Sequence, residues 1–181
     1  MRKGGEAELM RFLKTPKHWK SAREIVSMMK LAEAEVVREL WHEVGVRLKQ
    51  KGRLEDPQYS VENNLKYISS PVIDWPEYVS FDIGQSVEAG RRYLYCEIFI
   101  EIADKRSRGL LKRLKAEEFL PGQDSVSKYF YREFTTSLEP EDWPMHGRKT
   151  MKVLADEITQ KGTEFLSEVG RLIKRERRKP N

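Results

Sequence analysis

The chain of 181 residues is long enough for one large domain or two small ones, so we do not expect a large multidomain enzyme. Hydrophobic residues make up 39% and charged residues 35%, which indicates a modest core beneath a densely ionic surface. The single cysteine, Cys96, excludes an internal disulfide and a cysteine-based metal cluster. Because no run reaches the ~20 apolar residues of a membrane span and the start has no apolar leader, we expect a protein of the reducing cytoplasm that makes no membrane contact.

Positive charge is concentrated toward the two ends of the sequence. The formal net charge is +5, with a basic excess in residues 1–70 and 141–181 and an acidic excess in residues 71–140. Lysine and arginine placed against phosphates release condensed counterions, which drives binding without sequence preference. The charge therefore favours a polyanionic partner, although many proteins of this charge bind no nucleic acid.

The first third of the chain is predicted to form three helices. Apolar residues at helical spacing indicate a helix over residues 6–13. Ser21 and Glu24 have the spacing of a capping box, so a short second helix is expected to begin there. After a connector at residues 30–31, a third helix is predicted over residues 32–44 because it carries a broad apolar stripe. The stripe consists of Val36, Val37, Leu40, Trp41 and Val44.

A basic ribbon is expected after Gly45, which is predicted to end the third helix. Residues 46–54 alternate apolar with basic side chains, as a strand or a hairpin arm does. Such a ribbon presents its cations on one side, where they can contact a phosphate backbone. The candidate contacts are Arg47, Lys49, Lys51 and Arg53.

Three short helices, carried mainly by residues 21–44, and a basic ribbon resemble the winged helix-turn-helix domain. We therefore predict a winged-helix-like first domain over residues 1–70. The resemblance implies that the third helix enters the major groove while the ribbon contacts phosphates. However, Glu35, Glu39 and Glu43 repeat every four residues on the outward side of this helix, and carboxylates repel phosphates. These three residues favour the alternative that the helix binds a basic protein partner.

A second, α+β domain is predicted over residues 71–181. Residues 56–76 are rich in turn-forming residues and are interpreted as a linker, with the boundary near Ser70. Periodicity in the rest of the chain indicates a small, mainly antiparallel sheet with the element order ββαβα, covered by two helices. The expected strands are residues 78–83, 93–102 and 126–138, and the expected helices are residues 107–119 and 148–173.

The strand over residues 93–102 gives the strongest structural signal. One of its faces is entirely apolar and contains Cys96, so we expect a central strand with a buried, unreactive thiol. The other face carries aromatic residues that could stack unpaired bases, but Glu97 and Glu101 among them oppose phosphates. We therefore expect the long C-terminal helix to cover this second face.

Several motifs of the second domain resemble an uncharacterised domain at the C-terminus of proteins related to PD-(D/E)XK nucleases. They are the strand over residues 92–102, the Asp104 and Lys105 that follow it, the next helix, and the run over residues 138–144 that leads into the long helix. The resemblance extends over residues 72–175. It implies a DNA-associated setting in defence or mobile-element biology.

Catalysis is not expected from these motifs. A PD-(D/E)XK site needs two carboxylates to hold Mg²⁺ and a lysine to orient water. The nearest set is Asp82, Glu101 and Lys105, but Ala103 stands where the second carboxylate belongs. The three histidines lie on separate segments and no glycine-rich phosphate loop is present, so we predict no catalytic residue, no metal site and no cofactor. A divergent metal-dependent nuclease is the alternative.

The C-terminal run over residues 171–179 holds six basic residues and one acidic residue. It could grip phosphates or form a solvated helix end that suits the helix dipole. The candidate phosphate contacts are Arg171, Lys174, Arg175, Arg177 and Arg178. We expect a non-catalytic regulator or accessory protein that binds nucleic acid, foremost duplex DNA, with transcription regulation as one role. The alternative is an inhibitor or adaptor of a nuclease or defence complex, and a homodimer is compatible with either.

Overall fold

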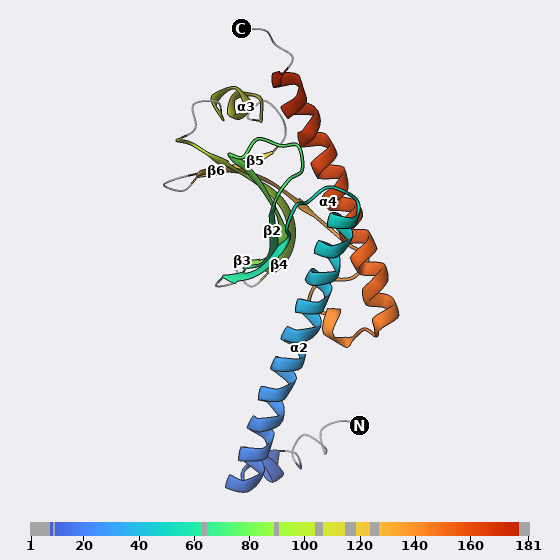
Figure 1. The fold of residues 1–181 in the computed structure, drawn as a ribbon. Helices are drawn as coiled ribbons and strands as arrows, with labels where there is room; N and C mark the ends of the chain where they lie inside the picture. Colours follow the sequence, from blue (N-terminus) through green and yellow to red (C-terminus); the bar gives the residue numbers. More distant parts are fainter. Residues whose placement is uncertain are drawn as a thin grey trace. The chain divides into compact units, whose positions relative to one another are not determined.

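The computed structural model describes residue 8 and residues 10–62, 65–88, 91–103, 107–114, 119–123 and 127–177. The chain divides into two compact units, residues 1–37 and residues 38–181. Helices and antiparallel strands are both present, so the predicted α+β class is confirmed (Figure 1). The domain boundary predicted near Ser70 falls inside a strand that is paired on both sides.

The long helix α2 (Pro16–Gln50) occupies the segment for which two helices and a ribbon were predicted. Pro16 suits a first helical turn, where its missing N–H is not needed, and the Trp19 N–H donates to the Thr15 carbonyl at 2.9 Å. The supposed capping box of Ser21 and Glu24 and the supposed connector at residues 30–31 are therefore interior helix. The prediction of two separate helices and a wing is therefore wrong for this segment, whereas residue 8 and residues 10–13 are helical, within the range predicted for the first helix.

Helix α2 ends in a cap at Gly52 and not at Gly45. Gly52 has a φ of 63°, and its N–H and that of Arg53 donate to carbonyls of the last helical turn at 2.8 and 3.1 Å, as in a Schellman motif. Gly45 is buried inside the helix, where a Cβ would lie 3.2 Å from the Pro57 side chain. Gly45 thus allows a close approach, and residues 46–54 form the last turn of α2 and its cap.

Six antiparallel strands form one sheet in the order β1-β2-β3-β4-β6-β5. Strand β4 pairs with β3 and β6, so its predicted central position is confirmed. The predicted linker is wrong in part, because it contains β1 and β2, and the turn-forming pair Asn63 and Asn64 stands between them. The strands are β1 (Gln58–Glu62), β2 (Leu65–Pro71), β3 (Val79–Glu88), β4 (Arg91–Glu101), β5 (Leu120–Gln123) and β6 (Ser127–Phe134).

Helix α4 (Arg148–Arg177) covers the apolar face of the sheet (Figure 1). The rings of Phe165 in α4 and Phe81 in β3 lie 6.0 Å apart, and a Cβ at Gly162 would lie 3.0 Å from Ile83. The helix therefore covers the face of Cys96, and the prediction that it covers the tyrosine face is wrong. Burial of the purely apolar face removes more hydrophobic area from water, which explains the choice.

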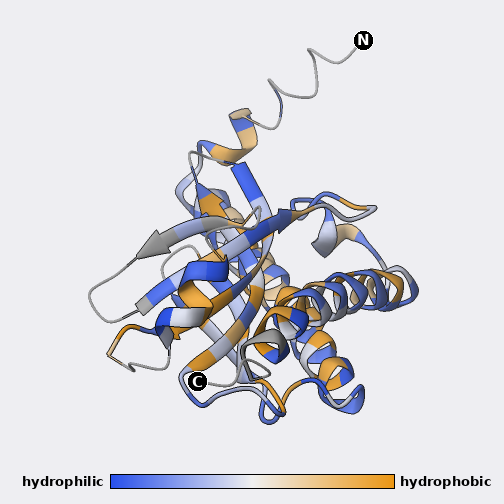
Figure 2. Cartoon of the chain, turned by 90° about the horizontal axis from the view of Figure 1, so that it is seen from above, coloured by the Kyte–Doolittle hydropathy of each residue, from blue (hydrophilic) through white to orange (hydrophobic). Residues whose placement is uncertain are grey.

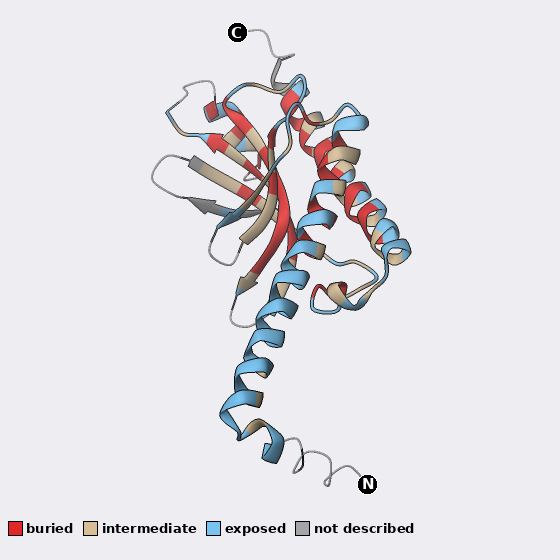
Figure 3. Cartoon of the chain, turned by 60° about the horizontal axis from the view of Figure 1, so that its bottom comes forward, coloured by how far each residue is buried: buried red, intermediate tan, exposed pale blue. Residues whose placement is uncertain are grey.

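The core of the second unit lies where the last turns of α2, helix α4 and the sheet meet (Figure 3). Trp41 in α2 and Trp143 in the short 3-10 helix η1 (Trp143–Met145) are fully buried, with ring centroids 6.1 Å apart in an edge-to-face arrangement. The predicted stripe of α2 is confirmed, except that Val36 is only half-buried. Helix α3 (Ser107–Leu114) packs against the end of α4, where Arg113 donates to the Leu172 carbonyl at 3.1 Å.

The first unit presents large apolar side chains to solvent. Most described apolar residues of the first two predicted helices are exposed, in contrast to the buried stripe that follows them in α2 (Figure 2 gives the hydropathy of the described residues). Exposed apolar patches of this kind are typical of interaction surfaces. The residues that are more than half exposed are Met10, Phe12, Trp19, Ile25, Val26, Met28, Met29 and Leu31.

At Gly84 in β3, the neighbouring strand β2 leaves no room for a side chain. A Cβ at this position would lie 2.5 Å from both the Lys66 carbonyl oxygen and the Tyr67 Cβ. We expect Gly84→Ala to lower the free energy of unfolding by about 1–3 kcal/mol, because β2 and β3 must move apart to admit the methyl group. Gly147→Ala is the matched control, because nothing lies within 4 Å of that position. Urea unfolding measures both, and equal stabilities would contradict the expectation.

Candidate functional site

A cavity of about 560 Å³ opens in the second unit beside the cap of α2, the turn after β2 and the end of α4. Three cations line it, namely Arg53 from the cap and Arg171 and Lys174 from α4. Trp75 lines it as well, and Asp74 is the one acidic residue of its lining. We call this cavity the basic groove. It brings together one cation of the predicted ribbon and two of the predicted basic tail.

Local backbone geometry places Arg53 and Trp75 in the groove. The Arg53 carbonyl accepts a hydrogen bond from the Ile73 N–H at 3.2 Å, so the segment after α2 runs alongside the end of β2. A tight turn follows, in which the Trp75 N–H donates to the Val72 carbonyl at 3.0 Å. Asp74 in this turn has a φ of 66°, a conformation that aspartate tolerates better than most residues.

Helix α4 supplies the other wall of the groove. Arg171 and Lys174 are three residues apart and therefore lie on one side of the helix, and both are exposed. Gly170 leaves this wall without a side chain, and a Cβ there would lie 3.6 Å from the Trp75 Nε1 atom. The groove therefore combines two exposed cations with an indole ring that closely approaches the helix backbone at Gly170.

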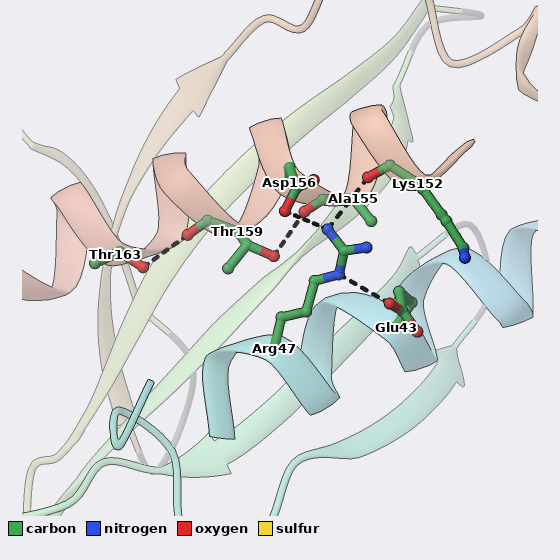
Figure 4. A network of polar contacts seen from close by, with 7 residues as sticks. All are labelled: Glu43, Arg47, Lys152, Ala155, Asp156, Thr159 and Thr163. Carbon is green, nitrogen blue, oxygen red and sulfur yellow. Dashed lines mark hydrogen bonds and ion pairs between the residues drawn. The ribbon is translucent and has the colours of Figure 1, made fainter. Parts of the chain in front are cut away.

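Arg47, a predicted phosphate contact, is half-buried and paired with carboxylates of α2 and α4 (Figure 4). Its guanidinium contacts Asp156 and donates to Glu43 at 2.9 Å and to the Lys152 carbonyl at 3.2 Å. Partial burial lowers the pKa of Arg47, but the hydrogen bonds to the two carboxylates outweigh it and raise the pKa. The side chain thus joins α2 to α4 as a permanent cation, which argues against a role in phosphate binding.

The other predicted contacts are scattered. Lys49 and Lys51 are exposed, and the Lys49 Nζ atom lies 3.9 Å from an Asp56 carboxylate oxygen. Arg175 and Arg177 belong to the last turns of α4, although their side chains and Arg178 lie outside the described part of the chain. The three glutamates of the predicted acidic stripe also differ in their surroundings. Glu43 binds Arg47, whereas Glu35 and Glu39 are exposed on α2.

A second unusual arrangement lies on the outer face of the sheet, the face opposite α4 that carries Tyr67, Asp82, Tyr95, Glu97 and Tyr131. In the strand register Asp82 stands directly opposite Glu97. Asp82 is only 5% exposed, and its Oδ1 atom has no hydrogen-bond partner in the described part of the chain. Burial raises the pKa of Asp82 to about 7, which a hydrogen bond with Ser69 opposes, and it raises that of Glu97 to about 8.

This carboxyl pair was not predicted from the sequence, because Asp82 was instead grouped with Glu101 as the nearest set to a nuclease metal site. The Glu101 N–H instead donates to the Tyr78 carbonyl at the end of β4, and Lys105 lies outside the described residues. The pairing of Glu88 with Arg91 sets the register that places residue 82 opposite residue 97. Within the described residues, no group of three or more metal-ligating side chains could hold an ion.

Cys96 is buried on the apolar face, as predicted, and burial raises the pKa of its thiol well above the usual range. Across the described ranges, no helix is both long and apolar enough to cross a membrane. No protein-family model, curated protein or solved structure matches the chain.

The carboxyl pair predicts a dependence of stability on pH. The pKa of Asp82 rises from 3.8 to about 7 and that of Glu97 from 4.5 to about 8, so the folded state holds more protons than the unfolded state in between. The contribution of the pair to the free energy of unfolding is therefore complete below about pH 4 and is lost as the pH rises to about 8. We expect Asp82→Asn and Glu97→Gln each to make the free energy of unfolding depend less on pH. At about pH 8.5 each should raise the free energy of unfolding by about 1–3 kcal/mol, because each pKa unit corresponds to about 1.4 kcal/mol.

Urea unfolding between about pH 5 and about pH 9 measures this effect. Glu101→Gln serves as the control, because it removes an exposed carboxylate from the end of the same strand. A decline that persists unchanged in both Asp82→Asn and Glu97→Gln would show that other groups cause it.

Proposed function

We propose that the chain is a non-catalytic nucleic-acid-associated regulator or accessory protein that holds phosphates in the basic groove. The observation that carries the proposal is the convergence of Arg53, Arg171 and Lys174 on one cavity from two segments far apart in sequence. Three cations against one lining carboxylate, Asp74, leave the groove with an excess of positive charge. Such an excess attracts a polyanion and releases its counterions on binding.

The chemistry of the cations supports phosphate as the ligand. The planar guanidinium groups of Arg53 and Arg171 can each donate two parallel hydrogen bonds to phosphate oxygens, and Lys174 adds a mobile point charge. This mode of binding does not use a winged helix, which α2 does not form. The resemblance of residues 72–175 to a domain of PD-(D/E)XK nuclease-related proteins supports a DNA-associated setting in defence or mobile-element biology. We propose no cleavage, because Ala103 replaces the second metal-binding carboxylate of that motif.

The proposal predicts the effect of removing charge from the groove. We expect the triple variant Arg53→Gln, Arg171→Gln, Lys174→Gln to lose at least about tenfold in affinity for nucleic acid at about 100 mM salt. The slope of log K against log salt should fall by up to about 0.9 for each duplex phosphate contact removed. Fluorescence anisotropy titrations at several salt concentrations measure both quantities.

A matched control separates the groove from general charge. The triple variant Arg108→Gln, Lys112→Gln, Arg148→Gln removes the same charge from exposed positions outside the groove. We expect it to change the slope much less. If the two triple variants lose equal affinity, binding depends on overall charge and not on the groove. If the unmodified chain binds neither DNA nor RNA, the proposal is refuted.

A second candidate function, binding of a protein through the first unit, is favoured by its exposed apolar side chains. The alternative of an inhibitor or adaptor in a nuclease or defence complex would use this surface together with the exposed Glu35 and Glu39. Trp19, Val26 and Met29 follow one another at intervals of seven and three residues along α2, which is the spacing of a helix-pairing seam. We propose a second copy of the chain as the partner on this seam.

Self-association tests this second candidate. We expect the unmodified chain to dimerise at micromolar concentration in sedimentation velocity and the double variant Val26→Asn, Met29→Asn to stay monomeric, because polar amides would have to be buried in the seam. Val61→Asn is the control, since Val61 is a similarly exposed apolar residue in β1. An unmodified chain that stays monomeric up to about 100 μM would contradict the candidate.

A further inference from the structure

We propose that the basic groove receives an unpaired nucleotide, whose base packs against Trp75 while its phosphate contacts Arg53, Arg171 and Lys174. This inference rests on the proposed function and narrows its ligand from nucleic acid in general to single strands. It differs from the duplex partner expected from the sequence.

The shape of the groove is the first argument. A volume of about 560 Å³ lies within the range of about 300–1,000 Å³ that is typical of pockets for small organic ligands. A duplex keeps its bases stacked and paired inside two backbones, so it offers phosphates but nothing that could enter such a cavity. A single strand can turn one base out of its stack and insert it.

The composition of the walls is the second argument. Phosphates require only the cations, yet the groove is also lined by the exposed Ile73 and by the core residues Val72, Leu166 and Ile173. Apolar walls suit the faces of a planar base, which sheds water when it is enclosed. Cations and apolar walls in one cavity thus match the two halves of a nucleotide.

The position of Trp75 is the third argument. Its backbone N–H is held by the turn after β2, and its side chain is half-buried, so part of the indole ring is accessible. Aromatic side chains of this kind stack bases regardless of base identity. Gly170 lets the ring approach the bare helix backbone, because a Cβ there would already be in van der Waals contact with the indole, 3.6 Å from its Nε1 atom. The indole ring and Gly170 thus belong to one wall of the cavity, and we propose that the base packs against this wall.

Two variants test the base site without removing any charge. Trp75→Leu deletes the stacking surface, and Gly170→Leu places a side chain in the cavity. Gly170→Ala is the matched control, because a Cβ there makes only ordinary contacts with Trp75, the nearest atom being 3.6 Å away. Both Gly170 substitutions raise the helix propensity of this position. The probes are a single-stranded oligothymidine of about twelve nucleotides and a hairpin duplex of the same charge.

We expect the unmodified chain to bind the oligothymidine more tightly than the duplex. Trp75→Leu and Gly170→Leu should each lower the affinity for the single strand by about 5- to 100-fold while the duplex affinity and the salt slope stay unchanged. The single strand should also quench tryptophan fluorescence, and Trp75→Leu should abolish the quenching. Trp41 and Trp143 are fully buried and Trp19 is exposed in the first unit, so the difference between the unmodified chain and Trp75→Leu isolates the quenching of Trp75.

The outcomes separate this inference from the proposed function. If the triple variant of the groove cations weakens binding but Trp75→Leu and Gly170→Leu leave single-strand affinity unchanged, the base site is refuted and the phosphate groove stands. If no probe binds the unmodified chain, both fail. Equal losses for single strand and duplex in the two base-site variants would also overturn the inference, because the variants would then have disturbed the groove as a whole.

Discussion

Burial of the apolar face of β3 and β4 is the constraint on which the rest of the second unit depends. Ile83 and Ile98 on this face are fully buried, and among the described residues α4 and the last turns of α2 supply apolar surface that covers it. Because both helices lie on one side, the tyrosines and the Asp82–Glu97 pair are left to the outer face. The same packing brings the cap of α2 to the groove that α4 lines, so the position of Arg53 follows from the core.

The sequence predicted those elements whose periodicity is strong over a long run. The alternation in β4 indicated a central strand, and the stripe that ends at Val44 indicated the buried side of α2. Glycine was the main source of error, because a glycine in a helix can either end it or allow a close contact. Gly45 is buried near Pro57 and Gly52 takes a positive φ, and only tertiary packing distinguishes the two cases.

The candidate sites were harder to predict than the elements, because they depend on long-range pairing. Nothing in local sequence indicates that Arg53 meets Arg171, and the periodicity of residues 46–54 suggested a wing that would have placed Arg47 on the surface. Arg47 instead forms the ion pairs that join two helices. A cation that pairs with carboxylates of its own chain and a cation that binds phosphate look alike in local sequence, so the two roles can be distinguished only when the neighbouring carboxylates are known.

The continuity of α2 across the division between the two units has a consequence for its helix–coil equilibrium. Starting a helix costs more free energy than extending one, and isolated helices are marginal in water. Buried side chains anchor the segment from Val37 to Leu48, so this segment nucleates the helix. The exposed turns before it are stabilised only by the free energy of extending a helix that already exists. Order should thus decay toward Pro16 turn by turn, and any ligand that covers those turns would gain affinity by starting from a helix already nucleated.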